Sequence, residues 1–140
     1  MRVITGTARG RRLKTPDNYD IRPTTDNVKE SVFNIIQFDI EGRQVLDLFA
    51  GTGQLGIECL SRGAAGAVFV DRDKDAVRIV KDNLKTCGMK ATVLQEDSIS
   101  FLNHCGKFDV IFIDPPYDSD LYESALKIIN LVDILSEGGI

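Results

Sequence analysis

The sequence has few of the side chains that many enzymes use to bind metals or to act as nucleophiles. It contains one histidine and three cysteines, and it has no tryptophan. Cys59, Cys87 and Cys105 are odd in number and far apart, which disfavours a disulfide framework and a CxxC zinc site. His104 is adjacent to Cys105, and two neighbouring residues form a poor metal chelate. A nucleophilic triad would have to use His104 alone. We therefore expect neither a metal site nor a histidine-based hydrolase.

The sequence also lacks long apolar runs. None approaches the roughly 20 residues that a membrane-spanning helix needs. The first residues, MRVITGTARGRR, contain no apolar core of a secretory signal. A length of 140 residues and a hydrophobic fraction of 43% are typical of a single globular domain. We expect a cytoplasmic protein without a membrane partner, and favour a monomer.

Positive charge is concentrated at the N-terminus. The net charge is −4, yet residues 1–14 contain five basic residues and no acid, which leaves −9 for the remainder. The five residues are Arg2, Arg9, Arg11, Arg12 and Lys14. A basic segment on an acidic body is typical of a protein that binds a polyanion. A solvated, flexible N-terminus would give the same pattern.

Apolar runs alternate with amphipathic segments along the rest of the sequence. The strands that we expect are 45–49, 67–70, 91–94 and 108–113. One helix is expected to follow the glycine-rich segment and end near residue 62, and a second to begin after Asp73. Two more are expected over 99–102 and 121–132. This alternation predicts an α/β fold, a Rossmann-like doubly wound and mostly parallel sheet with helices on both faces. The final EGGI resembles a turn into a further strand, so we expect the C-terminal strands of the sheet to be missing from this chain.

The chain is expected to divide into two parts after residue 22. Residues 1–22 should form a basic N-terminal arm or hairpin, and residues 23–140 the C-terminally incomplete catalytic domain. In the latter, a first helix should begin at Thr25. Its apolar face is predicted to carry Val28, Val32, Ile35 and Ile36.

A glycine-rich segment, DLFAGTGQLG, leads from the first expected strand into a helix. Glycines let the backbone turn sharply and approach a ligand, and the following helix N-terminus favours anions. Gly51, Gly53 and Gly56 also satisfy the dinucleotide pattern GxGxxG, with Asp71 where a ribose-binding acid should be. A nicotinamide or flavin enzyme is therefore an alternative. Asp47 opposes it, because its carboxylate suits a cationic amino-acid group better than a pyrophosphate.

Two further acids follow expected strands. Asp97 and Ser98 come after the third strand, where Asp97 can accept a hydrogen bond from an adenine amino group or cap the next helix. Asp71 can likewise be an ordinary loop acid. Its place at the carboxyl end of a strand favours a functional role, because ligands bind at that edge of open parallel sheets.

The tetrapeptide DPPY ends the fourth expected strand and opens at the same edge. Two prolines fix the backbone, Tyr117 offers a ring for stacking on a base, and Asp114 and Pro115 offer acceptor oxygens. Acceptors on both N–H groups of an exocyclic amine would aim its lone pair at a sulfonium methyl group. Positioning and electrostatics would then supply the catalysis. A purely structural proline turn is the alternative.

The motifs DLFAGTG, VDRD, EDS and DPPY, in this order, resemble those of class I S-adenosylmethionine-dependent methyltransferases. RGRRL and RPTTDNVKESVFNI narrow the resemblance to the bacterial 16S rRNA guanine-N2 methyltransferase family, along essentially the whole sequence. The resemblance implies methyl transfer from S-adenosylmethionine to the exocyclic N2 amine of a guanine in small-subunit ribosomal RNA. The implied partner is that RNA, or the small subunit or its assembly intermediate. Members of the family continue past GGI to a sheet of seven strands.

The resemblance also implies roles for single residues. The implied cofactor-binding residues are Asp47, Gly51, Gly53, Asp71, Arg72, Asp97, Ser98 and Thr25. The residues implied to hold the target guanine are Asp114, Pro115, Pro116 and Tyr117. The residues implied to contact RNA phosphates are Arg9, Arg11, Arg12 and Lys14.

Three other functions remain open at this stage. DPPY does not separate guanine from adenine, so a DNA or other RNA adenine-N6 methyltransferase is an alternative. So short a protein offers little surface for DNA sequence readout. A non-catalytic RNA-binding assembly factor would keep the same fold. A nicotinamide-dependent oxidoreductase would leave DPPY unexplained.

Overall fold

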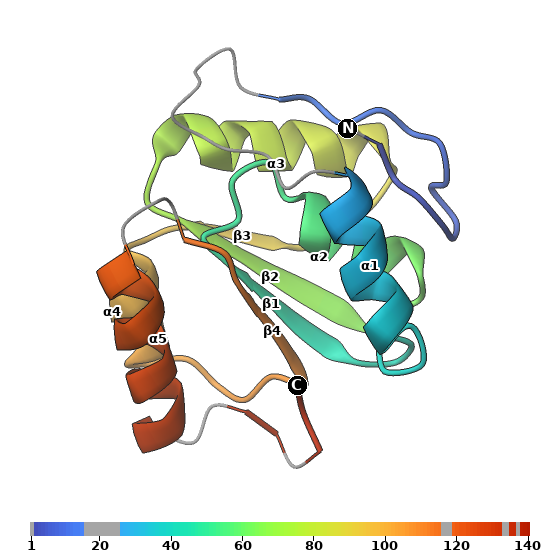
Figure 1. The fold of residues 1–140 in the computed structure, drawn as a ribbon. Coiled ribbons are helices and arrows are strands. Elements are labelled where there is room, and N and C mark those ends of the chain that lie inside the picture. The colour runs from blue at the N-terminus through green and yellow to red at the C-terminus, as the bar shows by residue number, and fades with distance from the viewer. Residues whose placement is uncertain (1, 16–25, 116–118, 133–134, 137) are drawn as a thin grey trace.

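A computed structural model describes residues 2–15, 26–115, 119–132, 135–136 and 138–140 (Figure 1). The strands are β1 (Gln44–Leu48), β2 (Gly66–Asp71), β3 (Thr92–Gln95) and β4 (Val110–Ile113). The helices are α1 (Asp26–Ile36), α2 (Gln54–Ser61), α3 (Lys74–Thr86), α4 (Ser98–Leu102) and α5 (Ser119–Val132). None of these helices is both long enough and apolar enough to cross a bilayer.

The four strands form one sheet in the order β3-β2-β1-β4, and every neighbouring pair is parallel. This confirms the predicted doubly wound α/β fold. The order reverses between β1 and β4, so the backbone leaves β1 toward one edge and later returns to its other side. In open parallel sheets, such a switch point forms a crevice at the carboxyl ends of the strands.

Helices α1, α2 and α3 lie on one side of the sheet and α4 and α5 on the other (Figure 1), and an apolar cluster lies on each face. One contains residues of α1, α2 and α3, with Phe33, Ile57 and Val80 packed against strand residues such as Phe69. The other contains Phe101 of α4 and residues of α5, packed on the opposite side of β1, β2 and β4. Successive strand residues point to opposite faces, which explains why the buried strands read as nearly continuous apolar runs.

Helix α3 follows its sequence prediction closely. The side chain of Asp73 caps the helix by accepting a hydrogen bond from Asp75 N at 2.9 Å. Val77, Val80 and Leu84 are buried, as predicted from their spacing. The helix ends just before Gly88, whose φ of 67° is a left-handed conformation that favours glycine.

Helix α1 agrees with its prediction in part, because Val32 and Ile36 pack against the apolar cluster of α1, α2 and α3 as their spacing predicts. Val28 and Ile35, expected on its buried face, are 53% and 80% exposed. The helix instead turns Phe33 and Lys29 inward, and both side chains are fully buried. The Phe33 ring packs against the Phe112 ring of β4 at a centroid distance of 5.8 Å. Positions 29, 32, 33 and 36 therefore form the inward face, which is rotated from the predicted one so that the aromatic ring and the paired lysine are buried.

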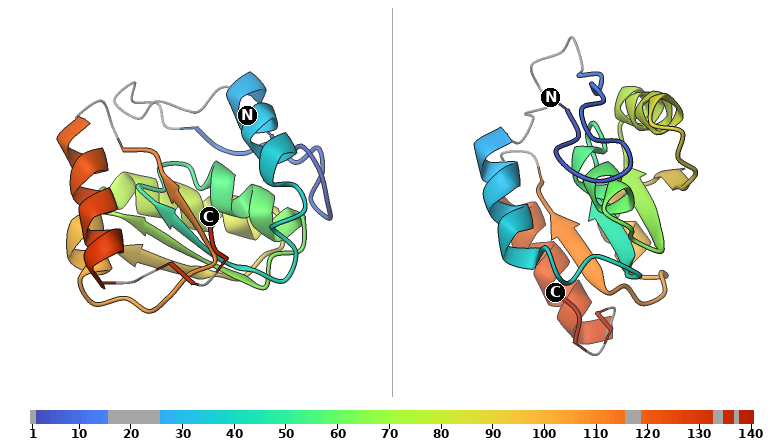
Figure 2. Two further views of the ribbon diagram at one scale, coloured as in Figure 1. Left: turned by 60° about the horizontal axis from the view of Figure 1, so that its bottom comes forward. Right: turned by 90° about the vertical axis from the view of Figure 1, so that its right-hand side faces the viewer.

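The N-terminal hairpin, residues 2–14, is docked on the domain (Figure 2, right). Its ends meet in an antiparallel bridge between Arg2 and Arg12. Val3, Ala8 and Leu13 are buried and belong to the apolar cluster of α1, α2 and α3. Of the two predicted forms, an extended arm and a hairpin, residues 2–14 adopt the hairpin, and residues 16–22 of the predicted segment 1–22 lie outside the described residues.

The last residues run along the outer edge of β4. Phe108, predicted as the first residue of the fourth strand, lies before β4 in an isolated parallel bridge with Leu135. Ile140 N donates to Asp109 O at 2.8 Å, and Ile111 N donates to Ile140 O at 2.9 Å. These two hydrogen bonds have the pattern of a parallel ladder, and no strand is assigned among the described residues after β4.

Candidate functional site

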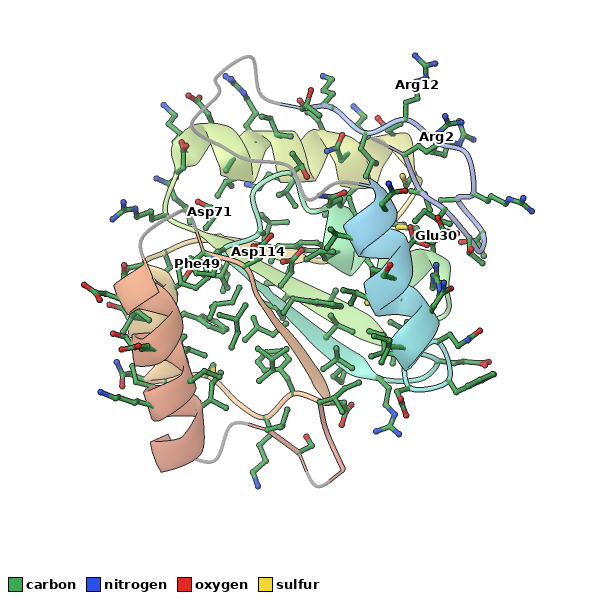
Figure 3. All side chains as sticks on the ribbon, in the orientation of Figure 1. Arg2, Arg12, Glu30, Phe49, Asp71 and Asp114 are labelled. Atoms are coloured by element: carbon green, nitrogen blue, oxygen red, sulfur yellow. The ribbon has the colours of Figure 1, made fainter. Side chains whose placement is uncertain are left out.

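Acidic residues from three strands meet at the carboxyl edge of the sheet. Asp47 lies in β1, Asp71 ends β2, and Asp114 directly follows β4. Figure 3 shows Asp71 and Asp114 near Phe49, which follows β1. We call these three acids, with the loop of residues 49–53, the strand-end site. The parallel topology brings together residues that are far apart in the sequence, as predicted from the strand ends.

Asp47 is the buried acid of the strand-end site, with a residue exposure of 2%. Its Oδ2 accepts a hydrogen bond from Gly56 N, in the first turn of α2, at 3.0 Å. Burial raises the pKa of Asp47 from 3.8 to about 8, although the hydrogen bond from Gly56 acts in the opposite direction. The nearby negative charges of Asp114 and Asp71 raise this pKa further. A buried carboxyl group among other acids is suited to a cationic partner.

The loop of residues 49–53 has an unusual backbone. Gly51 and Gly53 adopt left-handed φ values of 60° and 80°, as glycines can do without strain. Phe49 adopts φ 59°, and a bulky residue rarely does so. Sequence reasoning missed Phe49, because a phenylalanine at the end of an apolar strand gives no signal of backbone strain. Such strain is concentrated at functional loops.

Gly56 has a packing role. A Cβ atom at this position would lie 2.4 Å from Cε1 of the Phe69 ring on β2. The third glycine of the motif therefore lets α2 approach the sheet closely. The GxGxxG spacing predicts this contact in a dinucleotide fold, and it does not by itself distinguish one nucleoside cofactor from another.

Asp71 is held in place by two backbone amides. Gly51 N donates to Asp71 Oδ2 at 2.9 Å, and Asp73 N donates to Asp71 Oδ1 at 2.9 Å. The first contact ties the glycine loop to the end of β2. Each carboxylate oxygen can accept a second hydrogen bond, so ligand hydroxyls can still bind. The neighbouring Arg72 is exposed.

Asp97 serves as a helix cap. Its Oδ2 accepts a hydrogen bond from Ser100 N at 3.0 Å, at the start of α4. Asp97 is exposed and Ser98 is buried. The capping role considered from the sequence is therefore present.

The remaining predicted residues divide into two groups. Asp114 is exposed and Pro115 is half-buried, at the end of β4. Thr25, Pro116 and Tyr117 lie outside the described residues. Among the residues that the structure does describe, no group of histidine, cysteine and acidic side chains is arranged to hold a metal ion.

The predicted RNA-contacting residues lie on the docked hairpin. Arg9, Arg11, Arg12 and Lys14 are all exposed. Lys14 Nζ forms an ion pair with Asp82 Oδ2 on α3 at 3.2 Å. In Figure 3, Arg12 lies away from the strand-end site. The hairpin therefore presents its positive charges from a fixed surface.

A buried ionic cluster that sequence reasoning missed holds the hairpin. Glu58 of α2 is fully buried and accepts hydrogen bonds from Ile4 N at 2.8 Å and Thr5 N at 3.1 Å. Its two oxygens also pair with Lys29 Nζ at 3.2 Å and Arg62 Nε at 2.9 Å. The spacing of Glu58 and Arg62 predicts an exposed helix pair, and nothing in the sequence indicates that Lys29 turns inward.

The described residues outside these two regions suggest no further chemistry. His104 is exposed and hydrogen-bonds Glu96, which raises the pKa of the imidazole. Cys59, Cys87 and Cys105 are all free thiols, and burial raises the pKa of each. High thiol pKa values disfavour nucleophilic cysteine chemistry.

Solved structures with this architecture define the class of the protein. A structure from Escherichia coli, described as "Putative methyltransferase yhhF", matches with a TM-score of 0.84 and 39% identity, over 93% of this chain and 72% of that one. A Thermus thermophilus structure, described as a hypothetical protein, matches with a TM-score of 0.85 and 31% identity, over 99% of this chain and 82% of that one. The fold is the Rossmann-like α/β fold of methyltransferases.

The family follows from the sequence comparison. The family described as "Conserved hypothetical protein 95" matches residues 1–140, and the chain belongs to it. A Bacillus subtilis relative, named "Putative rRNA methyltransferase YlbH", is 46% identical over 99% of this chain and 79% of its own length. The Escherichia coli "Ribosomal RNA small subunit methyltransferase D" is 40% identical over 92% of this chain and 66% of its own length. The protein thus spans only part of each relative.

Proposed function

We propose that this protein transfers a methyl group from S-adenosylmethionine to the exocyclic N2 amine of a guanine in small-subunit ribosomal RNA. The observation that carries the proposal is the strand-end site, in which Asp47, Asp71 and Asp114 surround a left-handed glycine loop. The family membership and the names of the relatives support the same reaction class.

The residues present fit the cofactor. Asp47 is a buried carboxyl group with a raised pKa, and the ammonium group of the methionine part would favour its ionised form and pair with it. Gly51 and Gly53 leave room for the backbone to approach that part. Asp71 is fixed by two amides and would accept the ribose hydroxyls, with Arg72 beside the adenine. Asp97 and Ser98 would contact the adenine edge, and Thr25 would complete the cofactor site.

When bound, S-adenosylmethionine supplies an electrophilic methyl group on a sulfonium. Asp114 and the carbonyl of Pro115 would accept hydrogen bonds from the N2 amine, while Tyr117 stacks on the base and Pro116 stiffens the loop. These contacts direct the nitrogen lone pair at the methyl carbon. Transfer of this methyl group to N2 would break its bond to sulfur, yield S-adenosylhomocysteine and release one proton of the alkylated nitrogen to water. Positioning and electrostatics supply the acceleration.

The partner in this proposal is small-subunit ribosomal RNA, free or in an assembling subunit. Arg9, Arg11, Arg12 and Lys14 would contact its phosphates from the docked hairpin. An adenine-N6 methyltransferase and a non-catalytic assembly factor are the competing functions, and product analysis distinguishes them.

The test is methyl transfer from radiolabelled S-adenosylmethionine to small ribosomal subunits isolated from cells that lack the modification. The RNA is then digested to nucleosides, and we expect the label in N2-methylguanosine. Label in N6-methyladenosine would assign the adenine enzyme, and RNA binding without any label would assign the assembly factor. Tyr117→Ala is the companion variant, since loss of stacking should lower transfer about tenfold or more while S-adenosylhomocysteine affinity changes little.

A further inference from the structure

Asn83 of α3 contacts two separate loops at once. It is fully buried, and its Oδ1 accepts a hydrogen bond from Lys14 N at 2.6 Å. Its Nδ2 donates to Lys14 O at 3.2 Å and to Thr52 O at 2.9 Å. Lys14 ends the N-terminal hairpin, and Thr52 lies between the two left-handed glycines of the strand-end site. A single amide group therefore joins the basic hairpin to the glycine loop.

The contacts of Asn83 with both loops use backbone atoms of those loops. Its amide fixes the backbone N–H and carbonyl of Lys14 and the backbone carbonyl of Thr52. The amide therefore couples the two backbones whatever side chains the loops carry. Movement of one loop without the other would leave a polar group unpaired away from water, so we expect the two loops to move together.

The opposite side of the hairpin is attached separately. Ser61, at the end of α2, accepts a hydrogen bond from Ala8 N at 3.0 Å and donates to Thr5 O at 2.6 Å. Ser61 is the last residue of α2, whereas the glycine loop lies directly before the first residue of that helix. The hairpin therefore has one attachment shared with the glycine loop and another at the far end of α2. This difference supplies a matched control.

We infer that Asn83 is a positioning residue through which cofactor binding and RNA binding strengthen each other; this rests on the proposed function. A ligand that contacts Gly51 and Gly53 restrains Thr52, and through Asn83 it restrains Lys14. RNA bound to the hairpin restrains the same amide from the other side. Each ligand then meets a partner loop that is already ordered, which is the condition for positive cooperativity without a large structural change.

The test measures the affinity of small-subunit ribosomal RNA with and without saturating S-adenosylhomocysteine. We expect the cofactor product to tighten RNA binding of the unchanged protein roughly fivefold or more, and RNA to tighten S-adenosylhomocysteine binding by the same factor. In Asn83→Ala both affinities should fall, and the factor by which one ligand tightens binding of the other should approach one. Ser61→Ala should weaken RNA binding and keep the factor, and Asn103→Ala, an exposed asparagine that follows α4, should change neither.

Hydrogen exchange on the unchanged protein keeps the inference testable if Asn83→Ala does not fold. S-adenosylhomocysteine should slow exchange of the Lys14 amide, whose hydrogen bond Asn83 accepts. No added protection there, or an unchanged factor in folded Asn83→Ala, would overturn the inference while leaving the proposed function in place. Failure of the unchanged protein to bind S-adenosylhomocysteine at all would instead overturn the proposed function, and the inference with it.

Discussion

Asp47 Oδ2 accepts a hydrogen bond from Gly56 N at 3.0 Å, and this contact joins the end of β1 to the first turn of α2. The contact fixes the spacing between the strand and the helix. Asp47 is an acid where an apolar residue would bury more favourably, because taking a carboxylate out of water is costly. In the proposed function this cost is offset when Asp47 binds the cationic group of the cofactor.

Replacing the Asp47 carboxyl group should stabilise the fold increasingly as pH rises. In the unfolded protein the group ionises near its ordinary pKa of 3.8, whereas in the folded protein the pKa is about 8. Between these values the folded state holds a proton that the unfolded state lacks, so the free energy of unfolding falls with rising pH. Asp47→Asn removes this titration and keeps an acceptor for Gly56 N.

Urea unfolding at pH 5, 6, 7 and 8 measures the effect of Asp47→Asn. The free energy of unfolding of the variant should exceed that of the unchanged protein by a margin that grows with pH, by about 1.4 kcal/mol per pH unit between pH 5 and 7. Asp39→Asn, at an exposed position, controls for the loss of one negative charge. A margin that shrinks with pH would contradict the buried, protonated state of Asp47.

Gly56→Ala should destabilise the protein through packing. The added methyl group would lie 2.4 Å from the Phe69 ring, so α2 or the ring must shift. Overpacking of this kind typically costs about 1–3 kcal/mol. Gly106→Ala is the control, because a Cβ atom there meets nothing within 4 Å. Equal unfolding midpoints for the two variants would show that α2 does not approach β2 as closely as described.

Glu58→Gln should be strongly destabilising. It leaves the buried ammonium of Lys29 without its carboxylate at 3.2 Å, and breaking a buried ion pair from one side costs about 3–5 kcal/mol. Replacing both partners is milder, so Lys29→Met combined with Glu58→Gln should recover part of the loss. Chemical unfolding of the single and double variants measures both effects. A double variant less stable than Glu58→Gln would contradict the pairing.

Neutralising two hairpin arginines should weaken RNA binding and flatten its salt dependence. Arg11 and Arg12 contribute to the hairpin through backbone hydrogen bonds and a backbone bridge, so Arg11→Ala with Arg12→Ala should leave the hairpin docked. Losing two phosphate contacts should reduce the slope of log affinity against log salt by about 1 to 2. Lys127→Ala on α5, on the other face of the sheet, is the control. An unchanged slope would show that these hairpin arginines do not contact RNA phosphates.

Much of the fold could be predicted from the sequence, because the spacing of apolar residues and the capping and terminating residues indicate the same elements. The cap at Asp73, the buried stripe of α3 and the glycine that follows the helix all lie where local rules place them. The proximity of Asp47, Asp71 and Asp114 also follows from local information, since each lies at or near the end of a strand. Strands joined by helices are parallel, so their carboxyl ends lie at the same edge of the sheet.

The features that sequence reasoning missed depend on tertiary contacts. Lys29 reads as a solvated helix residue, and only its pairing with Glu58 allows full burial. Val28 and Ile35 read as core, yet the helix turns Phe33 inward instead. Asn83 reads as a polar residue near a helix end, and its role depends on two loops that lie 69 and 31 residues away in the sequence. Periodicity contains no information of this kind.

Thermal unfolding with S-adenosylhomocysteine, with NAD as the comparison, tests the strand-end site most directly. Ligand at about 100 times its dissociation constant should add roughly 2.7 kcal/mol, a Tm shift of several degrees for a domain of this size. The account predicts a shift with S-adenosylhomocysteine, none with NAD, and a much smaller shift in Asp71→Ala. A shift with NAD alone, or a full S-adenosylhomocysteine shift in Asp71→Ala, would contradict it.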